Sequence, residues 1–367
     1  MRIVVSKDKL QNAITQTMKA VANRSTLALL DGILFVAKDN EIKLTGYDLE
    51  TGIEAVLAGD VLEEGSIVLT ARILNEIVRK LPEDVVSIDV DDSFVATINS
   101  GHAQFKIKGL DTNDYPQLPE VDASEKITVP QELLKEMVSQ TLFATSSDIS
   151  RPALNGILFN SSNGVLELAA ADGFRLAIRN EEFGADLPET KILIPGKALK
   201  NIQSILADSG DVTFYTTKNH VKFVMDDVVL ISRLIQQDFM NYSSVLPSTY
   251  ATKIEVNAAK FYDAVDRANL ILPSDDRRFP MSLSINGSNR MKITASTDIG
   301  NLDDEVEILD FDGDELEIDF NPRYFIDAFR VINDEIVRLE FNGPVGPCLI
   351  KSKEGDAFSY LVLPLRK

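Results

Sequence analysis

Residues that could carry catalysis are few in this chain of 367 residues. It contains two histidines, His102 and His220, and one cysteine, Cys348. Both histidines lie in alternating, strand-like contexts, and apolar residues flank the cysteine, so we expect structural or surface roles for all three. The sequence has no glycine-rich loop ending in Lys-Ser/Thr, no GxSxG elbow and no pair of Cys-x-x-Cys motifs. It therefore selects no enzymatic chemistry, although its many carboxylates leave a metal-dependent hydrolase open.

Acidic residues are concentrated in one segment. Ten of the seventeen residues from Asp303 to Asp319 are Asp or Glu, and none is basic. Asp310, Asp312 and Asp314 alternate as in a calcium-binding loop, but the glycine and the closing glutamate of that motif are misplaced. We expect a solvated loop between two strands and no metal site or cofactor, and whether the segment binds any ion stays open.

Composition and charge describe an ordinary globular protein. The chain is 44% hydrophobic and 26% charged, and its formal net charge is -20. Taken alone, this charge argues against tight binding of nucleic acid, which depends mostly on clustered Lys and Arg. The single cysteine, the lack of a signal-like N-terminus and the lack of long apolar runs predict a cytoplasmic protein.

The sequence repeats itself three times. Strand-like segments end at Asp48, Asp172 and Asp298, which are 124 and 126 residues apart. This period is the length of a whole domain rather than of a solenoid repeat. A second marker, a basic residue before an amphipathic helix, recurs after 125 and 126 residues, at Arg72, Lys197 and Arg323.

The repeat predicts three similar domains, 1–120, 121–249 and 250–367. Each repeat contains two helical patterns between alternating strand patterns, for example an apolar face at Leu133, Leu134, Met137 and Val138. We therefore expect an α+β fold in which each domain has two helices backed by antiparallel sheets. Three such domains in a row suggest an arc or a ring.

Two linkers separate the predicted domains. Residues 111–119 and 238–247 are rich in turn-forming residues, and residues 361–367 repeat part of their pattern at the C-terminus. The last segment has no domain left to join. Its apolar residues are expected to need, or to help form, a groove.

Three segments, together with the repeat and the length, carry a family resemblance: Ala171–Ala177, Leu154–Phe159 and the ending Leu363–Arg366. With them, the whole chain resembles the bacterial DNA polymerase III beta subunits, the replication sliding clamps. The resemblance implies a non-catalytic processivity factor. It implies a head-to-tail homodimer in which each chain forms half of a ring, with helices lining the hole and strands outside. The ring would encircle double-stranded DNA and bind the polymerase III alpha subunit, the clamp loader, other polymerases and repair factors through short linear peptides.

The resemblance also implies DNA-facing residues. These are Arg24, Arg72, Arg151 and Lys197. Ordinary solvated charges at these positions are the alternative. The neighbours of Arg151, which are Asp148, Pro152 and Ala153, depart from the aromatic and amide residues of relatives, so an additional single-strand contact there is in doubt.

A peptide-binding pocket between the second and third domains is implied in the same way. Its wall would comprise Leu154, Ala171, Gly173, Phe174, Arg175, Leu176, Met240, Val245, Val345, Val362, Leu363, Pro364, Leu365 and Arg366. Many relatives have Thr, His and Arg where this chain has Ala171, Phe174 and Ser244, so we expect a more apolar pocket. The alternative is that some of these residues, such as Leu176, belong to the core.

The resemblance also implies the contact that closes the ring. One side would be an edge strand with Phe105 and Ile107, and the other the end of a helix at Leu270, Ile271 and Leu272. An exposed apolar edge strand favours pairing with another chain. Two other classes remain open, a carboxylate-based nucleic-acid enzyme and a scaffold that displays peptide sites without DNA. A metal titration would distinguish the enzyme from a clamp, and retention on circular DNA would distinguish the scaffold from a clamp.

Overall fold

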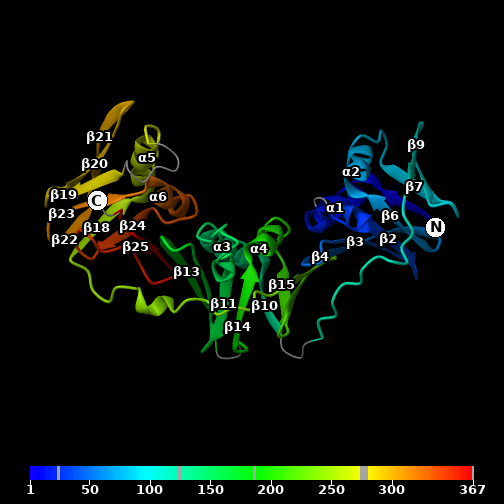
Figure 1. Ribbon diagram of the computed structural model, residues 1–367, viewed down its shortest axis with the longest axis horizontal. Helices are drawn as coiled ribbons and strands as arrows, with labels where there is room; N and C mark the ends of the chain where they lie inside the picture. The colour runs from blue at the N-terminus through cyan, green and yellow to red at the C-terminus, as the bar shows by residue number, and fades with distance from the viewer. Residues whose placement is uncertain (23–24, 123–125, 185–186, 273–279, 366–367) are drawn as a thin grey trace. The chain divides into compact units, whose positions relative to one another are not determined.

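The computed structural model describes residues 1–22, 25–122, 126–184, 187–272 and 280–365. The chain divides into two compact units (Figure 1). Unit 1 consists of Met1–Leu133 and Lys200–Leu234, and unit 2 of Leu134–Leu199 and Ile235–Lys367. The second sequence repeat is shared between the units because its strands pair with strands of the first repeat in one sheet and of the third repeat in another.

Unit 1 has two antiparallel sheets. The five-stranded sheet has the order β5-β1-β7-β8-β9, with β1 (Arg2–Ser6), β5 (Gly59–Glu63), β7 (Val85–Val90), β8 (Val95–Ser100) and β9 (Ala103–Lys108). The eight-stranded sheet has the order β10-β15-β16-β17-β4-β3-β2-β6, with β2 (Gly32–Lys38), β3 (Glu41–Tyr47), β4 (Thr51–Leu57), β6 (Gly65–Thr70), β10 (Lys126–Pro130), β15 (Asp211–Thr216), β16 (His220–Met225) and β17 (Val228–Arg233).

Unit 2 also has two antiparallel sheets. The nine-stranded sheet has the order β14-β11-β12-β13-β26-β25-β24-β18-β22, with β11 (Gly156–Ser162), β12 (Val165–Ala171), β13 (Arg175–Glu182), β14 (Thr190–Pro195), β18 (Thr252–Asn257), β22 (Asp310–Gly313), β24 (Ile336–Phe341), β25 (Cys348–Ser352) and β26 (Phe358–Val362). The four-stranded sheet has the order β21-β20-β19-β23, with β19 (Met281–Ile285), β20 (Arg290–Thr297), β21 (Gly300–Glu307) and β23 (Leu316–Phe320).

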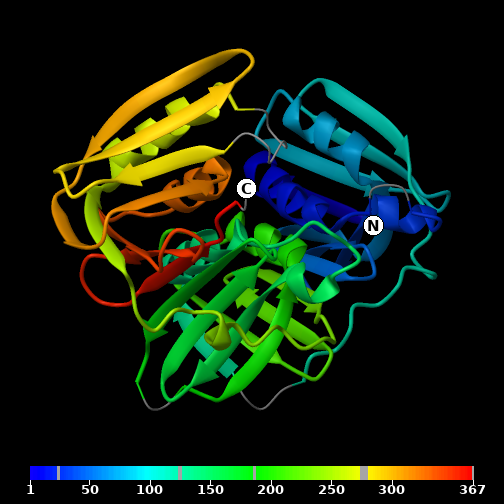
Figure 2. The same cartoon turned by 60° about the vertical axis from the view of Figure 1, so that its left-hand side comes forward.

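Six α-helices lie within the described residues, two in each sequence repeat as predicted. They are α1 (Lys7–Thr17), α2 (Ala71–Arg79), α3 (Gln131–Leu142), α4 (Gly196–Gln203), α5 (Ala258–Asn269) and α6 (Pro322–Phe329). Helix α5 lies along the sheet that contains β19, β20 and β21 (Figure 2). It packs on α6 through Phe261, whose ring centroid is 4.8 Å from that of Phe329 and 5.7 Å from that of Phe325. The apolar face of α5 thus covers a sheet, as the α+β interpretation requires.

The helices begin in different ways. Asn321 caps α6 by accepting a hydrogen bond from the Arg323 backbone N–H (3.1 Å), and Pro322 is the first helical residue. Thr70 occupies the cap position of α2, but its side chain accepts no hydrogen bond from the helix. Pro130 and Pro195 end the preceding strands instead of entering the first turn.

The acidic segment 303–319 is not a loop, and that expectation is wrong. It forms the end of β21, then β22 and β23. On β21, carboxylates pair with cations of neighbouring elements: Lys292 Nζ lies 2.7 Å from Asp303 Oδ2, and Arg290 Nη1 lies 3.0 Å from Glu305 Oε2. These cross-strand pairs offset the repulsion that the sequence alone suggests. The described residues include no group of three or more His, Cys, Asp or Glu that could hold a metal ion.

The three residues with catalytic potential are dispersed. Cys348 is fully buried in β25, and burial raises the pKa of its thiol. His220 begins β16, where desolvation lowers its pKa, and His102 lies exposed in the turn between β8 and β9. No helix in the described part of the chain is long and apolar enough to cross a membrane.

Candidate functional site

An aspartate turn organises the candidate site in unit 2. It joins β12 to β13, and Asp172 Oδ1 accepts hydrogen bonds from the backbone N–H groups of Phe174 (2.9 Å) and Arg175 (3.1 Å). Gly173, between them, has φ = 94°, a left-handed conformation that a glycine adopts without strain. The turn exposes Gly173 and fixes the direction of the Phe174 and Arg175 side chains.

The C-terminal segment pairs with this turn and its strand. Arg175 and Leu176 of β13 lie opposite Val362 and Leu361 of β26. Beyond the strand, the Leu363 N–H donates to the Phe174 carbonyl oxygen (2.9 Å), and the Leu365 N–H donates to the carbonyl oxygen of Asp319 (2.8 Å). The chain is therefore held by backbone hydrogen bonds up to Leu365, and it forms part of the site instead of fraying.

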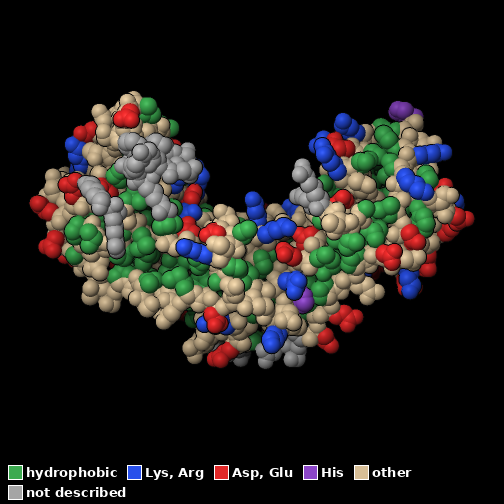
Figure 3. Space-filling view, viewed as in Figure 1, with side chains coloured by type: hydrophobic (Ala, Val, Ile, Leu, Met, Phe, Trp, Pro, Cys, Tyr) green, Lys and Arg blue, Asp and Glu red, His purple; other side chains and the backbone are tan. Residues whose placement is uncertain are grey.

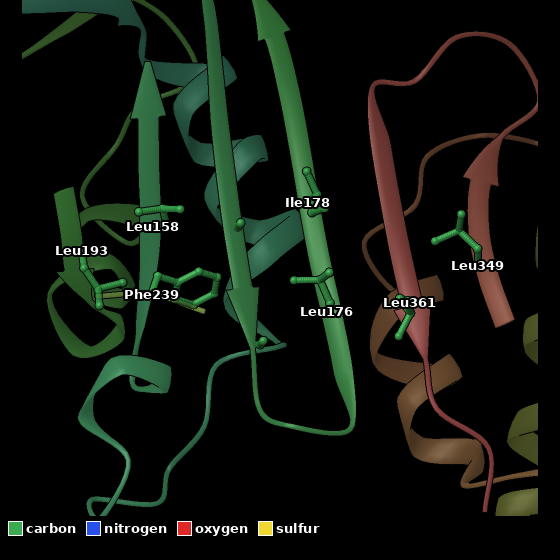
Figure 4. Packing of buried hydrophobic residues seen from close by; sticks show 9 residues of the cluster. Leu158, Leu176, Ile178, Leu193, Phe239, Leu349 and Leu361 are labelled. Carbon is green, nitrogen blue, oxygen red and sulfur yellow. The ribbon is translucent and has the colours of Figure 1, made fainter. Parts of the chain in front are cut away.

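A buried apolar cluster underlies the turn. In Figure 4, Leu158, Leu193 and Phe239 lie on one side of Leu176 and Ile178 of β13, and Leu349 and Leu361 lie on the other. The remaining members are Ala169 and Ala171, and partly buried residues pack on the cluster, namely Ala153, Leu154, Ile235, Tyr242 and Leu246. Linker 238–247 thus covers one side of the cluster with Phe239, Tyr242 and Leu246.

The predicted pocket residues fall into two groups. Ala171, Leu176 and Val362 are buried in the core. The others are half-buried or exposed: Leu154, Phe174, Arg175, Pro364 and Leu365 are half-buried, and Gly173, Met240, Val245, Val345 and Leu363 are exposed. Val345 lies in the loop before β25 and is 75% exposed. Arg366 lies outside the described residues. We call Leu154, Phe174, Met240, Val245 and Leu363 the candidate peptide surface.

Arg175 holds the turn to helix α6. Its Nε lies 2.9 Å from Asp172 Oδ2, and its Nη1 lies 2.7 Å from Asp327 Oδ2. The guanidinium carbon is 5.0 Å from the ring centroid of Tyr324 and 5.3 Å from that of Phe143. With two carboxylates and two rings around it, this guanidinium has an internal role, and its charge is already balanced.

Aromatic stacking extends this contact. The ring of Phe174 stacks on that of Tyr324, with centroids 6.3 Å apart and planes inclined by 8°. Sequence analysis did not identify Tyr324, Asp327 or Tyr242 as parts of the site. For Tyr324 the sequence offers one indication, since the residue lies in a predicted amphipathic helix, but its contact with the turn exists only in three dimensions. For Asp327 the sequence offers no indication. Tyr242 donates a hydrogen bond to Glu167, and burial together with this bond raises its pKa.

The predicted DNA-facing residues are exposed on separate elements. Arg72 lies on α2 in unit 1, and Lys197 lies on α4 and Arg151 before β11 in unit 2. Arg24 lies outside the described residues. A Cβ added at Gly173 would lie 3.4 Å from Arg151 Nη1, so Arg151 also borders the aspartate turn. In Figure 3, basic side chains (blue) lie among acidic (red) and uncharged ones on each unit.

The predicted dimer residues lie on an edge strand of unit 1 and near a helix end of unit 2. Phe105 and Ile107 lie on β9, the edge of the five-stranded sheet, and Phe105 is exposed. Leu270 follows α5 and is 76% exposed, but Leu272 is only 8% exposed. Leu272 is therefore packed within its own unit. Sequence analysis missed β21, which is the edge of the four-stranded sheet and carries the acidic side chains.

Comparisons with known proteins agree along the whole chain. Models of the DNA polymerase III beta subunit match residues 1–119 with its N-terminal domain, 128–241 with its central domain and 243–366 with its C-terminal domain. The "Beta sliding clamp" of Bacillus subtilis is 34% identical over 379 residues, with full coverage of both chains. That of a Staphylococcus epidermidis strain is 33% identical, covering 100% of this chain and 99% of the relative.

Solved structures give the same result. A crystal structure of a DNA polymerase III beta subunit from Eubacterium rectale is 37% identical, with a TM-score of 0.95 and full coverage of both chains. The crystal structure of the sliding clamp from Bacillus subtilis has a TM-score of 0.96 at 33% identity, covering 100% of this chain and 99% of that one.

The turn geometry generates a stability prediction. Asp172→Ala should lower the free energy of unfolding by about 2–3 kcal/mol, because two backbone donors and the half-buried Arg175 lose their acceptor. Asp172→Asn, which keeps an acceptor oxygen, should cost less than the alanine variant. Asp148→Ala is the control and should cost less, because the Asp148 carboxylate, which accepts hydrogen bonds from Ser150 (2.9 and 2.7 Å) and lies 3.9 Å from Arg151, is exposed. Denaturant unfolding followed by circular dichroism measures all three, and equal losses at Asp172 and Asp148 would contradict the assignment.

Proposed function

The chain belongs to the DNA polymerase III beta subunit family of sliding clamps, and from this premise we propose that it encircles duplex DNA as a head-to-tail homodimeric ring. The proposal assigns three clamp domains to residues 1–120, 121–249 and 250–367, so that two chains supply six. The observation that carries it is the agreement with the family along residues 1–366, in a chain whose described part has six helices backed by antiparallel sheets. In this function the protein is a cytoplasmic, non-catalytic partner of polymerases and needs no cofactor.

Ring closure through edge strands β9 and β21 is part of the proposal. Both strands have an unpaired edge within the described chain, which can add a strand from another copy. β9 carries Lys106 and Lys108, whereas β21 carries Asp303, Asp304, Glu305 and Glu307. Each of these four carboxylates lies beside a cation of its own unit, and the lysines of β9 would share them. This favours a head-to-tail contact between β9 of one copy and β21 of the next over contacts between like edges. Phe105 and Leu270 would contribute apolar area beside this pairing.

DNA binding in this proposal depends on topology more than on affinity. A closed ring stays on DNA without strong contacts, and tight phosphate binding would slow its sliding. A few exposed cations, Arg72, Arg151 and Lys197 together with Arg24, would make screened, mobile and sequence-independent contacts. The net charge of -20 would disfavour adhesion of DNA elsewhere on the protein.

Partner binding would use the candidate peptide surface. Its exposed side chains are apolar, and the guanidinium beside it is already paired with Asp172 and Asp327. A short linear peptide from the polymerase III alpha subunit, the clamp loader, other polymerases or repair factors would therefore be held mainly by apolar anchors. One fully buried anchor contributes about 1.5–3 kcal/mol.

DNA retention tests the ring itself. We expect the protein, once loaded on a nicked circular plasmid, to co-elute with the plasmid in gel filtration, and to be released when the plasmid is linearised. Arg151→Ala combined with Lys197→Ala should reduce retention, more so at low salt, because both remove exposed positive charge. Equal retention on circular and linear DNA would contradict encirclement, and a non-DNA scaffold would show no retention at all.

Assembly is tested by mass. Sedimentation should give twice the chain mass of 40.5 kDa, about 81 kDa. Phe105→Ala with Leu270→Ala should shift the equilibrium toward monomer, because two exposed apolar groups leave the proposed contact. Leu62→Ala is the matched control, since Leu62 is exposed on β5, the opposite edge of the sheet that contains β9. A wild-type monomer at micromolar concentration, or an equal shift in the control, would contradict this interface.

Peptide binding is tested at the C-terminus. Deleting residues 363–367 should abolish binding of a fluorescein-labelled peptide with leucine and phenylalanine side chains, measured by fluorescence polarisation. The deletion removes Leu363 and its hydrogen bond to Phe174. The mass of the dimer should stay unchanged, since the proposed dimer residues lie in other segments. Full affinity in the deletion variant would place the peptide site elsewhere.

A further inference from the structure

The aspartate turn of unit 2 occurs a second time, in unit 1. Between β3 and β4, Asp48 Oδ1 accepts hydrogen bonds from the backbone N–H groups of Glu50 (3.0 Å) and Thr51 (2.7 Å). Leu49, at the position of Gly173, has φ = 72°. A non-glycine residue in this conformation is uncommon, so the same backbone is kept in spite of the different residue.

The strand that follows the turn has an equivalent partner in each unit. In unit 1, Thr51 of β4 lies opposite Ser232 of β17, as Arg175 lies opposite Val362 in unit 2. Beyond β17, the Arg233 N–H donates to the Glu50 carbonyl oxygen at 2.9 Å. The Leu363 N–H makes the same bond to Phe174, also at 2.9 Å. Glu50 and Arg233 thus stand where unit 2 has Phe174 and Leu363.

The linkers extend the correspondence. Leu110 exchanges two backbone hydrogen bonds with Val68 on β6, and Ile235 donates to Leu193 on β14. Val68 and Leu193 are equivalent, because each lies opposite the third residue of its neighbouring strand, Leu34 or Leu158. The backbone that frames the candidate peptide surface is therefore present twice in the chain.

Side chains distinguish the two copies at the residue before the aspartate. Ala171 ends β12 opposite Leu176, whereas Tyr47 ends β3 opposite Gly52. Tyr47 is 7% exposed and packs in a cluster with Leu30, Val68 and Tyr115. Its hydroxyl donates a hydrogen bond to the carbonyl oxygen of Leu49 (3.4 Å), and burial raises its pKa. The ring thus lies against the aspartate turn of unit 1, at the residue that corresponds to Gly173.

Linker 111–119 also contributes a side chain beside the turn strand of unit 1. A Cβ at Gly52 would lie 2.2 Å from Leu118 Cδ2, so the Leu118 side chain occupies the place where a residue larger than glycine would project. Leu118 therefore takes over the packing role that Leu176 has in unit 2. At the position of Tyr47, unit 2 has the methyl group of Ala171, and Phe239 of the linker packs in the same cluster. At the rim, the apolar pair Phe174 and Leu363 is replaced by the charged pair Glu50 and Arg233.

We propose that unit 1 contains a closed second copy of the peptide site, and that the residue before the aspartate turn determines which copy accepts a peptide. In unit 2, Ala171 is buried and places only a methyl group beneath the exposed Leu363 and half-buried Phe174, whereas Tyr47 places a whole ring at the corresponding position in unit 1. The proposal rests on the peptide-binding function proposed above for unit 2. It predicts one peptide per chain, although the framework of the site occurs twice.

Closing the open copy is the first test. Ala171→Tyr should weaken binding of the fluorescein-labelled leucine–phenylalanine peptide by roughly tenfold or more, since the loss of one buried apolar anchor corresponds to at least that factor. Ala171→Ser, which adds one atom, is the matched control and should bind nearly as wild type does. Circular dichroism checks that both variants are folded. A folded Ala171→Tyr variant with wild-type affinity would overturn the proposal.

Opening the closed copy is the second test. The triple variant Tyr47→Ala, Glu50→Phe and Arg233→Leu transplants the three side chains of unit 2, and calorimetry should then give two peptides per chain instead of one. Tyr47→Phe keeps the ring and should leave the stoichiometry at one. One peptide per chain in the folded triple variant would overturn the proposal. Wild-type protein that binds no peptide would instead contradict the proposed function of unit 2, and this inference with it.

Discussion

Pairing of β13 with β26 is the interaction on which the rest of unit 2 depends. It joins a strand of the second sequence repeat to the last strand of the chain, and it places Leu361 and Val362 against Leu176 and Arg175. Without it, the C-terminal segment would lack the partner that positions Leu363 against Phe174. A site made of distant segments in this way exists only in the folded chain, because the closing strand is among the last residues of the sequence.

The charges of the chain are also partly balanced by pairs between neighbouring elements. An acidic chain of net charge -20 could be read as unsuited to DNA, yet some of its carboxylates pair with nearby cations: Arg267 Nη2 lies 2.6 Å from Asp304 Oδ2, and Arg175 lies between Asp172 and Asp327. Such pairs lower the local field. Arg72 on α2 and Lys197 on α4 are exposed to solvent. A protein that is linked to DNA by topology requires only this weak attraction, so a negative net charge and a DNA partner are compatible.

Sequence predicted the repeat, the six helices and the two linkers because these depend on local periodicity and turn-forming residues. It failed where the outcome depends on a distant partner. The segment 303–319 forms strands because cations on β20 and α5 pair with its carboxylates, and these lie outside the segment. Leu272 is buried, and Tyr324 stacks on Phe174, for the same kind of reason. Of the predicted pocket residues, sequence alone named Leu176 as a possible core residue, and Leu176 is buried. It could not separate Ala171 and Val362, which are also core, from Met240, Val245 and Leu363, which are exposed, because strand alternation ends at the turn.

The two aspartate turns illustrate how a repeated backbone can acquire different surfaces. Hydrogen bonds fix both frameworks, and these bonds involve a carboxylate and main-chain groups only, so the neighbouring side chains are free to diverge. In one copy the cross-strand pair is Tyr47 with Gly52, and in the other it is Ala171 with Leu176, which places the larger side chain on the opposite strand. In unit 1, the Leu118 side chain fills the place beside Gly52. One exchange of a large and a small residue across a strand pair thus changes the packing beneath the turn, while the sheet that supports the turn stays the same.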